Sequence, residues 1–182
     1  MTRWNSLYGS RGYCLEEMLN QVHKIYDKRN LALVTKIPVP IKVLRIVGKK
    51  IVEAFFEEKS ILDYQGIVQG NAVSFDAKET KLSYLPLKNI HKHQIKYMKK
   101  FDNQKGLTFI IVHFKSENRF FLIPVNVVYE YYINSLKGGR KSIPIEALDT
   151  RYEIKPSNGL PDYLEVLEKY RQDKYKEWKK SA

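Results

Sequence analysis

The order of apolar and polar residues along the chain predicts alternating helices and strands, as in an α/β domain. Residues 14–26 place apolar side chains on one helical face, and residues 31–35 form a short apolar run that is typical of a buried strand. The same patterns predict a helix that begins at Pro86, strands at 107–114 and 119–123 joined as a hairpin, and helices at 124–136 and 162–178. We therefore expect one α/β domain over residues 1–182, with a central mixed β-sheet flanked by helices.

The clearest strand pattern lies at residues 72–78. Val73, Phe75 and Ala77 share one face of this strand, so Asp76 and Lys78 project together from the other face. The polar face of the strand thus presents a carboxylate beside an ammonium group.

A second acid, Asp63, precedes this strand by one hairpin turn. Residues 69–71 supply the turn, because Gly and Asn tolerate the positive φ of tight turns. A Gln69–Gly70 loop would set Asp63 opposite the carboxylate of the strand, and a Gly70–Asn71 loop would set it opposite the lysine. Either register brings the three charged groups together.

Two carboxylates that face each other across a sheet repel, so the hairpin favours a bound cation, and a divalent metal ion is the natural candidate. The alternative is structural. In it, Asp63 is a turn residue that enters the strand, and Asp76 and Lys78 form an ion pair on one face. Spacing alone leaves both interpretations open.

Charge and composition narrow the class of partner. A net charge of +12 and a pI of about 9.6 favour polyanions, nucleic acid before an anionic membrane. No apolar run is long enough to cross a bilayer, and the N-terminus lacks an apolar signal core, so we expect a cytoplasmic protein that binds no membrane. The single cysteine, Cys14, has no partner for a disulfide or a zinc site, which agrees with a reducing compartment.

The spacing Asp63-(x)12-Asp76-x-Lys78 is similar to the signature of PD-(D/E)xK nucleases. Five segments also occur in the order found in the RecU family of Holliday junction resolvases: 63–66 (DYQG), 75–80 (FDAKET), 86–87 (PL), 91–95 (HKHQI) and 139–143 (GRKSI). The resemblance runs from about Arg11 to the C-terminal region. It implies the restriction-endonuclease-like fold, with a basic stalk, residues 38–60, that projects from the nuclease domain.

The resemblance also implies roles for single residues. Asp63, Asp76 and Gln94 would hold Mg²⁺, with Mn²⁺ as a substitute, while Lys78 would stabilise the charge that develops on the phosphate. Glu16, in the pattern Gly12-Tyr13-Cys14-Leu15-Glu16, would support the site from the first helix. The alternatives are a solvent-facing helix glutamate for Glu16 and a hydrogen-bonded core amide for Gln94.

Two positions depart from the family pattern. Asp76 stands where glutamate is common and is one methylene shorter, which shifts the metal or recruits a further water. Ile61 stands where the family commonly has a threonine, so only its backbone carbonyl could contact a metal.

Basic residues outside the hairpin are candidates for DNA contact. Five lie between Lys36 and Lys50 without an acid among them, and four of these, in the expected stalk, are Lys42, Arg45, Lys49 and Lys50. The alternative for this segment is a basic hairpin packed on the domain. Arg11, near the N-terminus, and Arg140 and Lys141, in a glycine-containing loop, complete the set, although that loop is also an ordinary helix C-terminus.

A shared transition-metal site at His91 and His93 is rejected, because we expect the two on opposite sides of a helix. The function that the resemblance implies is the resolution of four-way Holliday junctions by a homodimer through symmetric, metal-dependent nicks. A recombinase or the branch-migration machinery is the further partner implied. The alternatives are a nuclease of this fold for another DNA structure and a catalytically inactive junction-binding recombination protein.

Overall fold

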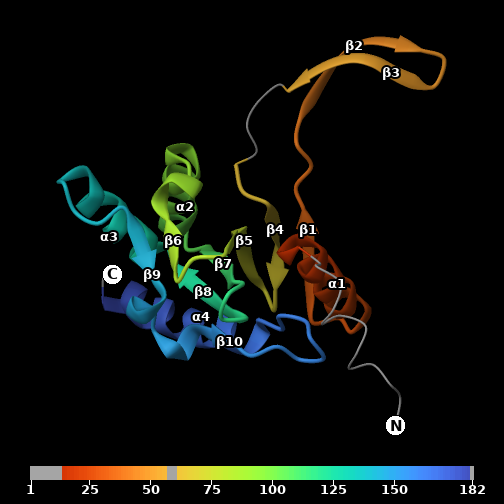
Figure 1. Ribbon diagram of the computed structural model, residues 1–182. Helices are drawn as coiled ribbons and strands as arrows, with labels where there is room; N and C mark the ends of the chain where they lie inside the picture. Colours follow the sequence, from red (N-terminus) through yellow and green to blue (C-terminus); the bar gives the residue numbers. More distant parts are fainter. Residues whose placement is uncertain (1–13, 57–60, 181–182) are drawn as a thin grey trace.

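The computed structural model describes residues 14–56 and 61–180, and within them the centre is a six-stranded sheet in the order β1-β4-β5-β7-β8-β10 (Figure 1). Only β5 and β7 run parallel, and every other neighbouring pair in this described sheet is antiparallel. The mixed sheet is therefore confirmed. Its strands are β1 (Ala32–Lys36), β4 (Tyr64–Val68), β5 (Asn71–Thr80), β7 (Leu107–Phe114), β8 (Arg119–Pro124) and β10 (Glu153–Ile154).

Helices cover both faces of this sheet. The first and last, α1 (Leu15–Lys28) and α4 (Leu164–Lys180), pack on one face, and α2 (Lys92–Asn103) and α3 (Val125–Leu136) pack on the other (Figure 1). The central strand β7 is buried on both sides, with Phe109 and Ile111 in one core and Ile110 and Val112 in the other. Its continuous apolar run follows from this double burial.

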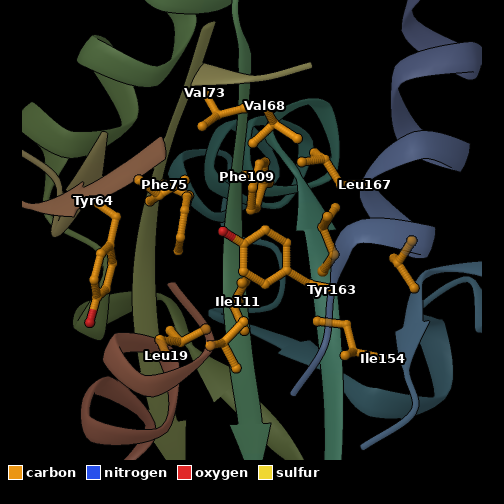
Figure 2. Packing of buried hydrophobic residues seen from close by; sticks show 14 of the residues in the cluster. Leu19, Tyr64, Val68, Val73, Phe75, Phe109, Ile111, Ile154, Tyr163 and Leu167 are labelled. Carbon is orange, nitrogen blue, oxygen red and sulfur yellow. The ribbon is translucent and has the colours of Figure 1, made fainter. Parts of the chain in front are cut away.

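The core under α1 and α4 is rich in aromatic rings. Phe75 lies between Tyr64 and Phe109, with ring centroids 5.0 and 4.8 Å away, and Tyr163 meets Phe75 edge-on (Figure 2). His23 of α1 is buried against these rings, and its Nε2 lies 3.0 Å from the Tyr163 hydroxyl. Burial lowers the pKa of His23 to about 4, so this imidazole is neutral in the folded protein.

The expected stalk is an antiparallel hairpin of β2 (Ile41–Val47) and β3 (Lys50–Phe56), which extends away from the domain (Figure 1). Every side chain from Ile41 to Phe55 is exposed. The projecting segment is therefore confirmed, and the alternative of a hairpin packed on the domain is wrong. Its predicted residues 57–60 lie outside the described part of the chain.

The predicted helix start at Pro86 is wrong. Residues Tyr84–Pro86 form a short strand, β6, which pairs with β9 (Ser142–Pro144), and Leu87–Asn89 form a 3₁₀ turn, η1. The helix α2 begins only at Lys92, because Pro86 keeps an extended ψ of 129° and its strand is paired. Two more 3₁₀ turns, η2 (Ile145–Ala147) and η3 (Thr150–Tyr152), lead to β10.

The last helix also begins later than predicted, at Leu164. Asp162 stays outside it because its carboxylate accepts hydrogen bonds from the Tyr26 hydroxyl and from Leu164 N, at 2.6 and 3.4 Å. Among the described helices, none is long and apolar enough to cross a membrane.

Candidate active site

The β4–β5 hairpin adopts one of the two predicted registers. Val68 pairs with Asn71, so the loop is Gln69–Gly70, with φ of 48° and 80°. These positive values identify the tight turn that matches the twist of the flanking strands. On its other side β4 pairs with β1, and this pairing requires Gly66, because a Cβ atom there would lie 2.1 Å from the Leu33 carbonyl oxygen.

The hairpin brings Asp63, Asp76 and Lys78 together. Asp76 is fully buried on the face of β5 that is turned away from α1, and its Oδ2 forms an ion pair with the Lys78 ammonium. Asp63 comes just before β4, and its Oδ2 accepts a 2.8 Å hydrogen bond from Ala77 N, between the other two residues. The convergence expected from strand alternation is therefore confirmed.

The electrostatics of Asp76 are unusual for a carboxylate. Burial raises its pKa to about 7, the Lys78 ammonium opposes this rise, and the neighbouring Asp63 carboxylate adds to it. Although Oδ2 touches Lys78, this buried atom accepts no well-directed hydrogen bond within the described structure. A second positive charge beside Oδ2 would stabilise the charged form of this buried carboxylate.

The donor set fits a hard divalent ion. Mg²⁺ prefers oxygen ligands and commonly takes one or two carboxylates, with water and substrate phosphate filling the other positions. In the described ranges, no three His, Cys, Asp or Glu residues gather as a closed ligand cage. The two adjacent carboxylates of Asp63 and Asp76 are therefore what this chain offers to Mg²⁺.

Gln94 lies beside these acids, in the first turn of α2. Its Nε2 donates to Asp76 Oδ1 at 3.1 Å, and its Oε1 accepts from His91 N at 3.0 Å. As placed, Gln94 orients Asp76 and caps its own helix. To serve as a metal ligand through its oxygen, the amide would have to turn over and release His91 N, so that role stays a prediction.

Glu16 lies on the opposite face of the sheet. Its carboxylate pairs with Lys36 at the end of β1, and its carbonyl oxygen accepts from the Tyr64 hydroxyl at 3.2 Å. The Lys36 pKa is raised, first by Glu16 and more weakly by Asp63, so Lys36 lies in the field of both acids. Glu16 is thus held near the site by a lysine, and its supporting role stays a prediction.

Basic residues lie on two surfaces. Arg140 is exposed and donates to Ser142 Oγ at 3.0 Å, while the Lys141 carbonyl accepts from Leu87 N at 3.0 Å. This bond sets the basic loop beside η1, the turn that leads into α2 and Gln94.

On the projecting hairpin, all four predicted DNA contacts are exposed: Lys42, Arg45, Lys49 and Lys50. The absence of acids along this segment does not persist in the fold, because pairing sets Glu53 opposite Arg45, with 3.9 Å between their charged groups. Arg11 lies outside the described residues.

The predicted geometry of His91 and His93 is wrong. His91 precedes α2 instead of lying in it, and the two rings stack with centroids 5.4 Å apart. The reason given for rejecting a shared metal site therefore does not hold; in the described chain no third His, Cys, Asp or Glu joins the two rings. Ile61, considered only for its carbonyl, is 40% exposed.

Two neighbours of the site were missed by sequence reasoning. Gln65 donates from Nε2 to the Tyr97 hydroxyl of α2, and Glu79 accepts at 2.9 Å from Leu15 N, the first amide of α1. Strand alternation was the available signal, because it places Glu79 on the face opposite Lys78. No sequence pattern indicates that the Glu79 face of β5 packs against α1.

Known proteins resemble this chain over most of its length. The family model described as RecU: Recombination protein U matches residues 10–169. A protein from Lactiplantibacillus plantarum named Holliday junction resolvase RecU is 37% identical over 175 residues, which cover 90% of this chain and 83% of that protein. One of the same name from Streptococcus gordonii is 34% identical over 170 residues, covering 89% of this chain and 84% of that protein.

Among solved structures, Archaeoglobus fulgidus Hjc, described as a Holliday junction resolvase from an archaeal hyperthermophile, aligns with 85% of this chain and 98% of its own. The identity is 10% and the TM-score 0.36, a likeness too low to bear on function.

Proposed function

The chain belongs to the RecU (recombination protein U) family, and from this membership we propose that it is a nuclease that resolves four-way Holliday junctions in recombination and DNA repair. Membership confirms the resemblance read from the sequence. The observation that supports the activity most strongly is the meeting of Asp63, Asp76 and Lys78 on one end of the β4–β5 hairpin.

The proposed chemistry is hydrolysis of a phosphodiester bond. Asp63 and Asp76 would hold Mg²⁺, or Mn²⁺ in its place, and the chemistry that the ion supplies when bound is activation of a water and neutralisation of charge on the scissile phosphate. Asp76 is buried and fixed by Gln94, so its carboxylate is oriented before DNA arrives.

Lys78 acts in the transition state. Its ammonium pairs with Asp76 and its side chain is 20% exposed, so it reaches both the buried acid and the surface where a phosphate would lie. As negative charge develops on the phosphate oxygens, Lys78 donates to them. The raised pKa of Asp76 makes metal binding depend on pH, because a carboxylate that holds a proton near neutral pH releases it when a cation binds.

Specificity for the four-way junction comes from the homodimer and from its basic surfaces. Symmetric nicks on two strands need two active sites, so the protein acts as a homodimer. The exposed basic hairpin, β2–β3, contacts the four-way junction, Arg140 and Lys141 contact the backbone beside the active site, and a recombinase or the branch-migration machinery is a further partner. A cytoplasmic location stays a prediction.

The test compares substrates. Purified protein with Mg²⁺ is incubated with a synthetic four-way junction, a linear duplex and a flap of matched sequence, each labelled on one strand. Preferential nicking of the junction is expected. Equal or better cleavage of the flap would indicate a nuclease for another DNA structure, and binding without any cleavage would indicate an inactive junction-binding protein.

A further inference from the structure

The first turn of α1 lies behind the active site, on the opposite face of the sheet from Asp76 and Lys78. Successive residues of a strand point to opposite faces, so the neighbours of the site residues face this turn. Tyr64 follows Asp63 and Glu79 follows Lys78. Both of these neighbours bond to α1.

Glu79 and Tyr64 both make hydrogen bonds to the N-terminal half of α1. Glu79 Oε1 accepts from Leu15 N at 2.9 Å, and the Tyr64 hydroxyl lies 3.2 Å from the Glu16 carbonyl oxygen and 3.1 Å from Asn20 Oδ1. Leu15 N is among the first amides of α1, which have no partner inside the helix. A carboxylate is a favourable acceptor there, because it also meets the positive end of the helix dipole.

Glu79 is itself fixed in place. Its Oε2 pairs with Lys115 at 2.9 Å, and its Oε1 lies 3.7 Å from Nδ1 of His113, a buried ring that stacks on Phe120 at 4.1 Å. Lys115 follows β7, and its backbone N–H donates to the Thr80 carbonyl oxygen at 2.8 Å. The carboxylate therefore joins three elements, β5, the end of β7 and the start of α1.

We propose that Glu79 is a positioning residue of the nuclease. By holding Leu15 N, it fixes the end of β5, and with it Lys78 and Asp76, against the first turn of α1. Tyr64 fixes β4 and Asp63 against the same turn, so α1 sets the spacing between the two strands that present the site. The inference rests on the proposed function, because a displacement of about 1 Å in a catalytic group matters only where chemistry occurs.

Two variants separate the contacts of Glu79. Glu79→Ala removes both the bond to Leu15 N and the ion pair with Lys115, whereas Glu79→Gln keeps an oxygen for Leu15 N and loses the ion pair. Glu79→Ala lowers the single-turnover nicking rate on a four-way junction by roughly 10- to 100-fold, the range for residues that orient catalytic groups. Junction affinity in Ca²⁺ stays unchanged, and Glu79→Gln restores most of the nicking rate.

The matched control is Glu153→Ala. Glu153 also accepts from charged groups, with bonds of 3.0 and 3.1 Å from Arg119, but it lies on β10 at the far edge of the sheet. Its loss destabilises the fold without touching the α1 contacts. A loss of nicking in this control equal to that of Glu79→Ala would overturn the proposal, since general destabilisation would then explain both. Equal impairment of Glu79→Gln and Glu79→Ala would overturn it as well, because the bond to Leu15 N would then be irrelevant.

Amide hydrogen exchange tests the anchoring independently of cleavage. Glu79→Ala should speed exchange in residues 15–18 and 76–79, whereas Glu153→Ala should speed it in residues 119–121 and 153–154. Unchanged exchange in the first turn of α1 of the Glu79→Ala variant overturns the proposal even if nicking falls. If the wild-type protein nicks no junction, the proposed function fails, and the exchange result alone decides whether Glu79 anchors the strands.

Discussion

Replacement of Asp76 by Asn should stabilise the protein in the presence of a chelator while it abolishes cleavage. Asp76 is fully buried, and burial together with Asp63 raises its pKa to about 7 from an ordinary 3.8. The folded-state pKa thus lies above the unfolded one. The stability that protonated Asp76 contributes is complete below pH 3.8 and is lost as the pH rises through about 7.

The size of the effect follows from the shift. Each pKa unit corresponds to about 1.4 kcal/mol, so near pH 8 the buried charge lowers the free energy of unfolding by about 4 kcal/mol at most. Asparagine is nearly isosteric, carries no charge and still accepts from Gln94 Nε2. Asp76→Asn should therefore recover part of this free energy near pH 8 and none of it near pH 4.

The assay is urea unfolding in chelator at both pH values, followed by the same measurement with Mg²⁺. The matched control is Asp102→Asn, because Asp102 is also buried but pairs with the buried Lys174 ammonium at 2.7 Å. Removing that charge leaves Lys174 with a weaker partner, so this control should lose stability. Added Mg²⁺ should stabilise the wild type and the control, but not Asp76→Asn.

Two results would refute this prediction: an Asp76→Asn variant that is less stable than the wild type near pH 8 in chelator, or equal changes in stability for Asp76→Asn and Asp102→Asn. Either result would mean that Lys78 already neutralises the Asp76 charge and that the site has no need of a cation.

Three further predictions concern other parts of the chain. Lys78→Ala should lower the nicking rate by about 10²- to 10³-fold with little change in junction binding, as measured by single-turnover kinetics and gel shift; a matching loss of affinity would make Lys78 a phosphate anchor instead. Alanine replacement of the hairpin residues Lys42, Arg45, Lys49 and Lys50 should weaken binding to the junction more than binding to duplex. Each lost phosphate contact should reduce the slope of log affinity against log salt concentration by about one unit. Equal losses on both substrates, in a folded dimer, would reduce the hairpin to a general basic surface. Burial lowers the pKa of His23 from 6.5 to about 4, so the stability that neutral His23 contributes is complete above pH 6.5 and is lost as the pH falls towards 4. His23→Gln should therefore reduce the pH dependence of the free energy of unfolding by up to about 3 kcal/mol, as measured by urea unfolding. An unchanged pH dependence would place the acid-sensitive group elsewhere.

Much of the site could be predicted from strand geometry alone. The period of two on β5 separates Phe75 from Asp76, and the Gln69–Gly70 turn then fixes which residue faces Asp63. These are local rules, and they hold because the apolar face of β5 packs in the core under α1 and α4. The projecting hairpin was recognised through the family resemblance, since its exposed apolar and basic residues have no periodicity that places it off the domain.

The predictions that failed, and the contacts that were not predicted, depend on segments that are distant in the sequence. Pro86 is a good first residue for a helix, but pairing with Ser142–Pro144 keeps it extended, and no local signal foretells that partner. The same applies to Glu53 opposite Arg45 and to Glu79 at the start of α1, where the partners become neighbours only through the fold. The role of Gln94 as a metal ligand stays a prediction, because its amide orientation depends on the hydrogen bond to His91 N, which sequence patterns do not indicate.

The most direct measurement is a map of the nicks made on a four-way junction with each strand labelled in turn. The wild-type protein with Mg²⁺ should cut two strands of like polarity at symmetric positions, and chelator should stop the cutting. Asp63→Asn and Asp76→Asn should bind the junction and cut neither strand. Nicks that persist in chelator, or that either variant makes at the wild-type rate, would contradict a metal-dependent resolvase centred on these two acids.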